Sequence, residues 1–120
     1  MNMTEVYQET AITTQSRGQI VVLLYEKAIQ SLGKAVTCIE KKDYEAKSQL
    51  ISRARDIICE LNQALNFQEG GDLAQNLRML YNFLFRFLGR ANIRNDSEMI
   101  LKSIGILEDL AGAWRKIAQE

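Results

Sequence analysis

The sequence contains no histidine, and that absence narrows the chemistry available to the chain. Histidine is the most frequent general base at neutral pH and the commonest metal ligand in proteins. The two cysteines lack CxxC spacing, and no glycine-rich phosphate loop follows a strand. Every position predicted to face the core is apolar, so we expect no carboxylate metal site in the interior. We therefore expect no catalytic activity, no cofactor and no metal.

Proline is absent as well. Proline inside a helix costs ~3 kcal/mol, and this chain is instead rich in Ala, Leu, Gln, Glu and Lys, so long uninterrupted helices are favoured. A chain of 120 residues fits one domain whose core needs no metal or disulfide. Cys38 and Cys59 are predicted on successive helices at different distances from the turn between them, and we expect them to remain unpaired.

The chain also carries no net charge, because 15 Lys and Arg residues balance 15 Asp and Glu residues. No overall field would attract nucleic acid or an anionic membrane surface. No stretch approaches the ~20 apolar residues of a membrane span. No basic residue precedes Arg17, and no apolar run there resembles a secretory signal. We expect a cytoplasmic protein that inserts into no membrane, binds no nucleic acid and holds its partner by apolar contact.

What the sequence does contain is four helical segments separated by caps. Ser16 and Gln19 form a capping box for a helix over residues 16–41. Asp43 is a natural N-cap for a second helix that ends before the glycine pair 70–71. A third helix spans about residues 73–93, and the acidic run that begins at Asp96 caps the fourth.

Apolar residues recur at helical spacing in each segment and mark its buried face. In the first helix they are Val21, Leu24, Tyr25, Ala28, Ile29, Leu32, Ala35, Val36 and Ile39. In the second they are Leu50, Ile51, Ala54, Ile57, Ile58, Leu61 and Leu65. In the third they are Leu73, Leu77, Leu80, Tyr81, Leu84, Phe87, Leu88 and Ala91. In the fourth they are Ile100, Ile104, Leu107, Leu110, Ala111, Trp114 and Ile117.

The predicted fold is all-α. Short connections make successive helices antiparallel neighbours, which gives an up-down-up-down four-helix bundle over residues 16–120. Residues 1–15 do not share the helical pattern and are predicted to form a separate N-terminal arm that docks on the bundle. We expect this arm to compete with any partner for the surface it covers.

Some apolar residues are surplus to a monomeric core, and we take them as candidate partner-binding residues. Ordinary packing beneath the arm or at a helix flank is the alternative for each of them. The candidates are Tyr7, Ile12, Ile20, Leu23, Phe83 and Phe85. Tyr81 and Trp114 fall on core faces, where packing is the preferred interpretation.

Arginines recur on the solvent side of the third helix at positions 78, 86 and 90, with Arg94 after them. We interpret them as a solvated helix face. An RNA-binding stripe would require a net positive charge and exposed aromatic residues between the arginines, and the chain is neutral overall.

Several motifs resemble the FliS family when taken in order. The chain has an N-terminal Tyr7, a Thr-x-Ser helix start at 14–16 and a Leu-Tyr-Glu triplet at 24–26. Gly-Gly-Asp-Leu-Ala-Gln-Asn-Leu follows at 70–77, then Leu-Tyr at 80–81, Arg-Ala-Asn at 90–92, Asn-Asp at 95–96 and Ala-Trp at 113–114. The joint order covers nearly the whole chain. Two departures are Arg17, where the family usually has proline, and Lys27, where it usually has glycine.

The resemblance implies a cytosolic export chaperone that binds the C-terminal segment of flagellin, prevents premature polymerisation and keeps the subunit competent for type III export. It also implies that the loaded chaperone presents its client to the export gate FlhA. The runner-up hypothesis is a structural or regulatory bundle that homodimerises through the surplus apolar residues and has no flagellin client. We favour a monomer.

Overall fold

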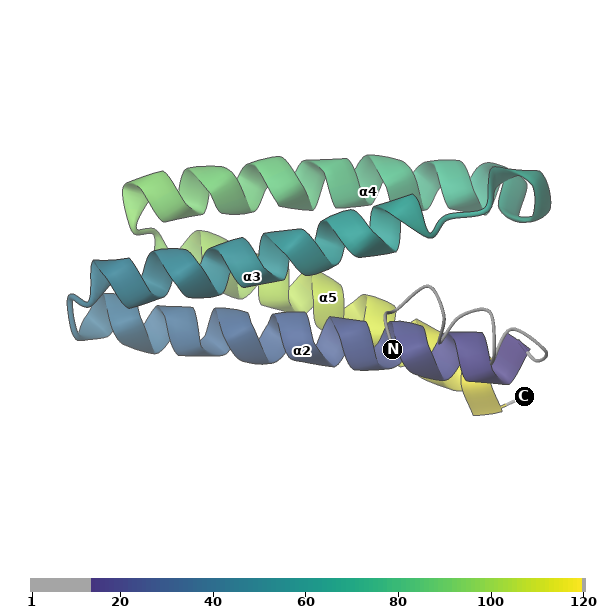
Figure 1. Cartoon of the computed structure of the whole chain (residues 1–120), viewed down its shortest axis with the longest axis horizontal. Coiled ribbons are helices and arrows are strands. Elements are labelled where there is room, and N and C mark those ends of the chain that lie inside the picture. Colours follow the sequence, from purple (N-terminus) through teal and green to yellow (C-terminus); the bar gives the residue numbers. More distant parts are fainter. Residues whose placement is uncertain (1–13, 120) are drawn as a thin grey trace.

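The computed structural model describes residues 14–119, and their side chains apart from those of residues 14–16, 67–69 and 117–119. It contains α2 (Thr14–Glu40), α3 (Tyr44–Gln63), α4 (Phe67–Arg94) and α5 (Ser97–Gln119). Each helix runs antiparallel to the one before it (Figure 1). The all-α, up-down-up-down prediction is confirmed.

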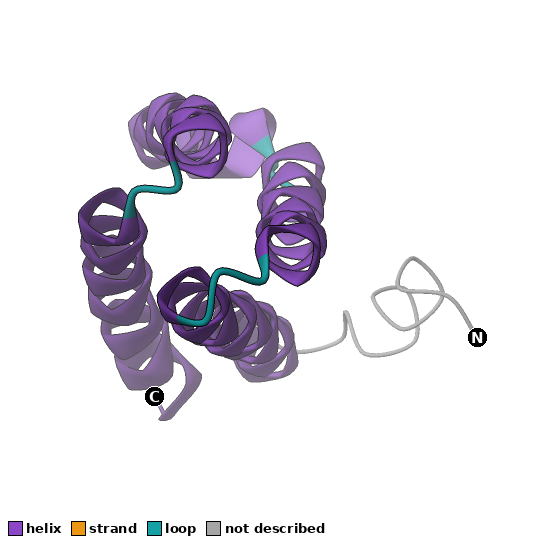
Figure 2. Ribbon diagram, turned by 90° about the vertical axis from the view of Figure 1, so that its left-hand side faces the viewer, coloured by secondary structure: helices purple, strands orange, loops and turns teal. Residues whose placement is uncertain are grey.

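The helices surround one central core. Helix α2 contacts α3 and α5, and α4 also contacts α3 and α5, so α2 and α4 occupy opposite corners (Figure 2). The molecule measures 45 × 30 × 22 Å. None of the helices in the described part of the chain is long and apolar enough to cross a membrane.

Two of the connections share one turn design. Lys42 and Asn95 both have positive φ, of 61° and 50°. After α2 the Lys42 amide donates to the Ile39 carbonyl and the Asp43 amide to the Cys38 carbonyl. These paired bonds form a Schellman motif, which satisfies carbonyls at the helix end. The same pattern follows α4, where the Asp96 amide donates to the Ala91 carbonyl.

In each turn, the residue after the positive-φ position is an aspartate that caps the next helix. The Asp43 carboxylate accepts from the Ala46 amide at 3.2 Å, and that of Asp96 accepts from the Met99 amide at 3.2 Å. Both predicted caps are therefore confirmed. The Ser16 cap is not, because α2 begins at Thr14 and places Ser16 within its first turn.

The remaining connection departs from the predicted boundaries. Helix α3 ends at Gln63, earlier than predicted, and a short helical segment from Phe67 joins α4 across a kink. Gly71 makes the kink with φ 51° and ψ −125°, a conformation open to glycine and costly for other residues. A Cβ on Gly70 would lie 2.8 Å from that of Ala74, so this glycine permits a close approach.

All four helices contribute buried side chains to the core, and the predicted faces of all four are confirmed in outline. The largest fully buried groups are Tyr25, Tyr81, Leu32, Ile51, Ile58, Leu84, Leu88, Ile100, Leu107 and Ser103. The Tyr25 and Tyr81 hydroxyls are hydrogen-bonded to each other inside this core. Cys38 and Cys59 are half-buried and unpaired, as predicted.

Four expectations about burial were wrong. Phe87 was placed on the buried face of its helix but is only half-buried and stacks on the exposed Phe83. Leu73 was placed on the core stripe but is 59% exposed, because it directly follows the kink and lies at the end of the bundle. Ile20 was placed outside the core face but packs against the core. The interior is also not wholly apolar, since Lys47 is only 4% exposed.

The buried lysine is tied to the end of α4. Its ammonium group donates to the Asn92 carbonyl at 2.8 Å, and the neighbouring Ser48 hydroxyl donates to the Asn92 side chain at 3.0 Å. Carbonyls at a helix C-terminus carry partial negative charge and accept such donors. Burial lowers the pKa of Lys47 by desolvating its charge.

Candidate functional site

A cavity of about 300 Å³ lies at one end of the bundle, where α2 and α4 start and α3 and α5 end. We call it the end cavity. Its lining residues are Arg17, Val21, Leu61, Ala64, Leu65, Asn66, Gly70, Leu73, Ala74, Leu77, Tyr81 and Trp114. The volume is at the lower end of the range for ligand pockets.

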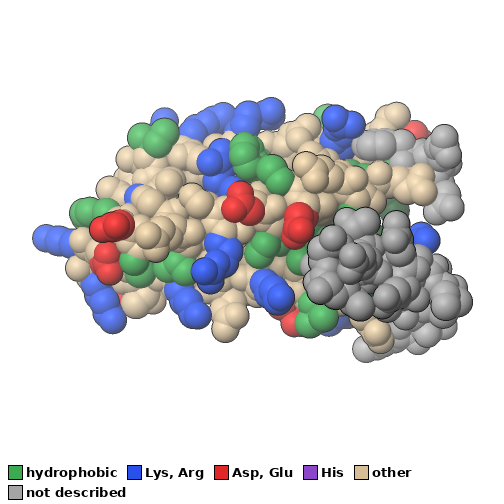
Figure 3. Space-filling model, in the orientation of Figure 1, with side chains coloured by type: hydrophobic (Ala, Val, Ile, Leu, Met, Phe, Trp, Pro, Cys, Tyr) green, Lys and Arg blue, Asp and Glu red, His purple; other side chains and the backbone are tan. Residues whose placement is uncertain are grey.

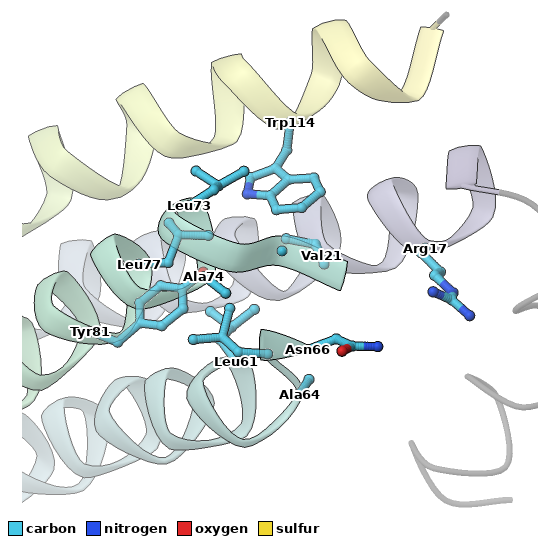
Figure 4. A pocket seen from close by; sticks show the side chains of 12 residues that line it. Arg17, Val21, Leu61, Ala64, Asn66, Leu73, Ala74, Leu77, Tyr81 and Trp114 are labelled. Atoms are coloured by element: carbon cyan, nitrogen blue, oxygen red, sulfur yellow. The ribbon is translucent and has the colours of Figure 1, made fainter. Parts of the chain in front are cut away.

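The kink at Gly71 creates one wall of this cavity. It turns the segment before it away from the axis of α4 and leaves Leu73 and Ala74 beside the space rather than beneath a continuous helix. Figure 4 shows Leu73 next to Trp114 on one side and Tyr81 next to Leu61 on the other. The glycine pair seen in the sequence therefore kinks the start of α4 and shapes the cavity.

The interior of the end cavity is apolar. Arg17 and Asn66 lie toward its outer end, and their side chains point away from the Leu61, Leu77 and Tyr81 group (Figure 4). Tyr81 is 2% exposed, and its hydroxyl is bonded to Tyr25. Such a surface binds apolar side chains and offers no convergent acid and base.

The chemistry elsewhere agrees with this description. Within the described residues, no group of three or more Cys, Asp or Glu side chains is placed to hold a metal ion. Lys47 on α3 has a lowered pKa, but it lies far from the cavity. Its ammonium group donates to the Asn92 carbonyl, near the end of α4 that is farther from the cavity. The end cavity is an apolar recess, which is the shape and chemistry that suit a binding site.

The comparison with known proteins identifies the family. The family model described as "Flagellar protein FliS" matches residues 1–120. The chain belongs to the FliS family.

Three curated relatives are named flagellar secretion chaperones. The FliS chaperone of Salmonella typhimurium is 35% identical over 115 residues, covering 95% of this chain and 85% of the relative. That of Bacillus subtilis is 31% identical over 113 residues, covering 94% and 84%. That of Vibrio cholerae is 30% identical over 120 residues, covering 97% and 88%. The resemblance inferred from the motifs is confirmed over the whole chain.

The candidate residues that the structure describes do not gather at one site of this FliS chain. Tyr7 and Ile12 lie outside the described residues. Leu23 is 55% exposed on α2, and Ile20 is half-buried against the core. Neither residue lines the end cavity.

The two phenylalanines on α4 have different surroundings. Phe83 is 42% exposed and stacks on Phe87, with ring centroids 5.1 Å apart. The guanidinium carbon of Arg55 lies over the Phe85 ring, 3.8 Å from the ring centroid. The Phe85 backbone carbonyl accepts a hydrogen bond from Arg55 Nε at 2.9 Å. Phe85 therefore helps to join α3 to α4, while Phe83 faces outward.

Sequence reasoning missed the residues that do converge. Trp114 and Leu73 were assigned to core faces by their helical phase; Trp114 does pack against the core, whereas Leu73 is exposed. Periodicity shows which side of a helix faces inward but not where a bundle ends. The one available signal was the glycine pair at 70–71, whose kink moves the start of α4 aside.

Proposed function

We propose that this FliS-family chain is a flagellar export chaperone that binds the C-terminal segment of flagellin in the cytoplasm. It holds that segment away from other subunits, prevents premature polymerisation and keeps flagellin competent for type III export. It acts by binding alone and catalyses no reaction. The loaded complex is then presented to the export gate FlhA.

The observation that carries this proposal is the full-length family match to proteins named flagellar secretion chaperones. The apolar end cavity supports it, because a chaperone must cover the apolar residues that its client would otherwise bury in a polymer. An amphipathic segment that is disordered when free can fold as it docks, with apolar anchors in such a cavity.

The neutrality of the chain favours the same mode of binding. Long-range attraction contributes little when the net charge is zero, so affinity must come from apolar area and shape. A monomer with an end cavity satisfies this requirement without a second copy. The measured mass in dilute solution should therefore be that of one chain, rising by one client on addition of flagellin.

The direct test is a binding assay with purified flagellin from the same organism, full-length and lacking its C-terminal segment. We expect full-length flagellin to bind and the truncated form not to bind. Retention of the truncated flagellin would overturn the proposed client segment, and a stable dimer that ignores both would favour the homodimer hypothesis.

A pair of variants locates the site. Ala74→Leu places extra volume in the end cavity, because Ala74 is 3% exposed and lines it. Ala113→Leu adds the same atoms at an exposed position of α5. We expect Ala74→Leu to weaken flagellin binding about tenfold or more and Ala113→Leu to leave it unchanged. Circular dichroism of both variants checks that the bundle is intact.

A further inference from the structure

The outward side of α4 combines exposed apolar and cationic side chains. Its members recur at three- and four-residue spacing between positions 79 and 94, which places them on one side of the helix. We call this surface the outer face of α4 and define it as Met79, Phe83, Arg86, Phe87, Arg90, Ile93 and Arg94. The core residues Leu77, Tyr81, Leu84 and Leu88 lie on the opposite side.

The apolar members are unusually open. Met79 is 70% exposed and Ile93 is 85% exposed. Phe83 is 42% exposed, and its stacking on Phe87 fixes the ring on the surface instead of in the core. Scattered exposed residues are normal on a protein, but here three exposed apolar side chains share one side of one helix.

The charge on this face has one sign. Residues 73–95 contain four arginines and no Asp or Glu, although the whole chain is neutral. Arg86, Arg90 and Arg94 are exposed and form no salt bridge with any residue that the structure describes. Figure 3 shows blue side chains gathered along the upper edge of the molecule, where α4 lies.

We propose that the outer face of α4 is a second docking surface, which binds an acidic amphipathic helix of a protein partner. Charge complementarity selects this occupant. Its carboxylates would pair with Arg86, Arg90 and Arg94, and its apolar stripe would cover Met79, Phe83 and Ile93. The stretch from 79 to 94 is ~22 Å long at 1.5 Å per residue, enough for about four turns of a bound helix.

Single-stranded RNA is the less suitable occupant. Base stacking requires aromatic faces, and Phe83 already stacks on Phe87. Met79 and Ile93, the most exposed members of the face, offer no stacking surface. The two α4 surfaces are also distinct from each other, because Ala74, Leu77 and Tyr81 of the end cavity lie on the inward side.

The test uses a synthetic 16-residue amphipathic peptide with leucines on one side and glutamates on the other. A comparator carries lysine in place of glutamate. We expect the acidic peptide to bind about tenfold or more tightly than the basic one, with an affinity that falls as salt is raised. Amide chemical shifts should change at residues 79–94.

Two charge-matched double variants separate this site from general electrostatics. Arg86→Gln with Arg90→Gln should weaken the acidic peptide about tenfold. Lys34→Gln with Arg53→Gln removes two exposed cations from α2 and α3 and should leave binding unchanged. Equal losses in the two variants would overturn the proposal, as would shifts confined to the end cavity.

Other occupants give different results. A uridine 20-mer or phosphatidylglycerol vesicles could bind more tightly than the acidic peptide and require Arg86 and Arg90. That result would overturn the proposal in favour of RNA or a membrane. Self-association that these substitutions abolish would replace the partner with a second copy. A flagellin C-terminal peptide should bind the Arg86→Gln, Arg90→Gln variant normally and should not displace the acidic probe. Displacement would mean that the two surfaces form one site.

Discussion

The hydroxyl groups of Tyr25 and Tyr81 are hydrogen-bonded to each other at the centre of the bundle, 0% and 2% exposed. They join α2 to α4, which occupy opposite corners. Apolar contact along their lengths holds neighbouring helices together but does not set the distance between α2 and α4 across the bundle. The hydrogen bond between the two tyrosines fixes that distance. Tyr81 also lines the end cavity, and the bond therefore supports the cavity wall.

Replacing either tyrosine by phenylalanine should destabilise the fold by about 1 kcal/mol, the usual net value of a buried hydrogen bond. The double variant should lose less than the sum of the two single losses, because both polar groups are then gone. Urea unfolding of the four proteins measures this coupling. Strictly additive losses would show that the hydroxyl pair contributes no shared energy.

The turn at Lys42 carries strain that glycine would relieve. Lys42 has φ 61°, and a residue with a Cβ pays roughly 1 kcal/mol in that conformation. Lys42→Gly should therefore raise the free energy of unfolding by up to ~1 kcal/mol. Lys41→Gly, at a neighbouring exposed position without positive φ, should be neutral or destabilising. Destabilisation by Lys42→Gly would show that the lysine side chain itself supports the turn.

Leu23 and Leu24 are adjacent on α2 but differ in burial, at 55% and 4% exposed. Leu23→Asp should change the free energy of unfolding by less than about 1 kcal/mol, as surface substitutions usually do. Leu24→Asp should unfold the protein, because it buries a charge in the core. Thermal melting compares the two. If Leu23 contacts the client, Leu23→Asp also weakens flagellin binding, and unchanged affinity removes Leu23 from the site.

Lys47 gives the stability a defined pH dependence. Burial lowers its pKa in the folded state, so between the folded and unfolded pKa values the unfolded chain binds more protons. Stability contributed by this group therefore rises with pH through that alkaline window. Lys47→Met removes the titration. The unfolding free energy of the parent relative to this variant should increase as pH rises toward the ordinary lysine pKa of 10.5. A constant difference would contradict the lowered pKa.

The fold was predictable because its signals are local. Asp43 and Asp96 cap their helices by contacts three residues away, and the apolar faces follow from a 3.6-residue period. The end of α3 was misplaced because residues 64–69 continue a helical composition after the helix itself has ended at Gln63. Nothing local announces that the chain leaves the helix there.

The end cavity was less predictable, since it depends on how four helices end relative to one another. Trp114 and Val21 are far apart in sequence and meet only because α2 and α5 are neighbours. Buried Lys47 escaped notice for a similar reason. Its partner is a backbone carbonyl on α4, and a carbonyl has no sequence signature.

Trp114 provides the most direct test of the central claim, because it is the single tryptophan of the chain and it lines the end cavity. Adding a tryptophan-free flagellin C-terminal peptide should change the fluorescence of Trp114 in a saturable way. Ala74→Leu should shift that titration to higher peptide concentration. A matched N-terminal flagellin peptide should have no effect. Calorimetric binding of the C-terminal peptide with unaltered Trp114 emission would contradict the assignment of the end cavity as the client site.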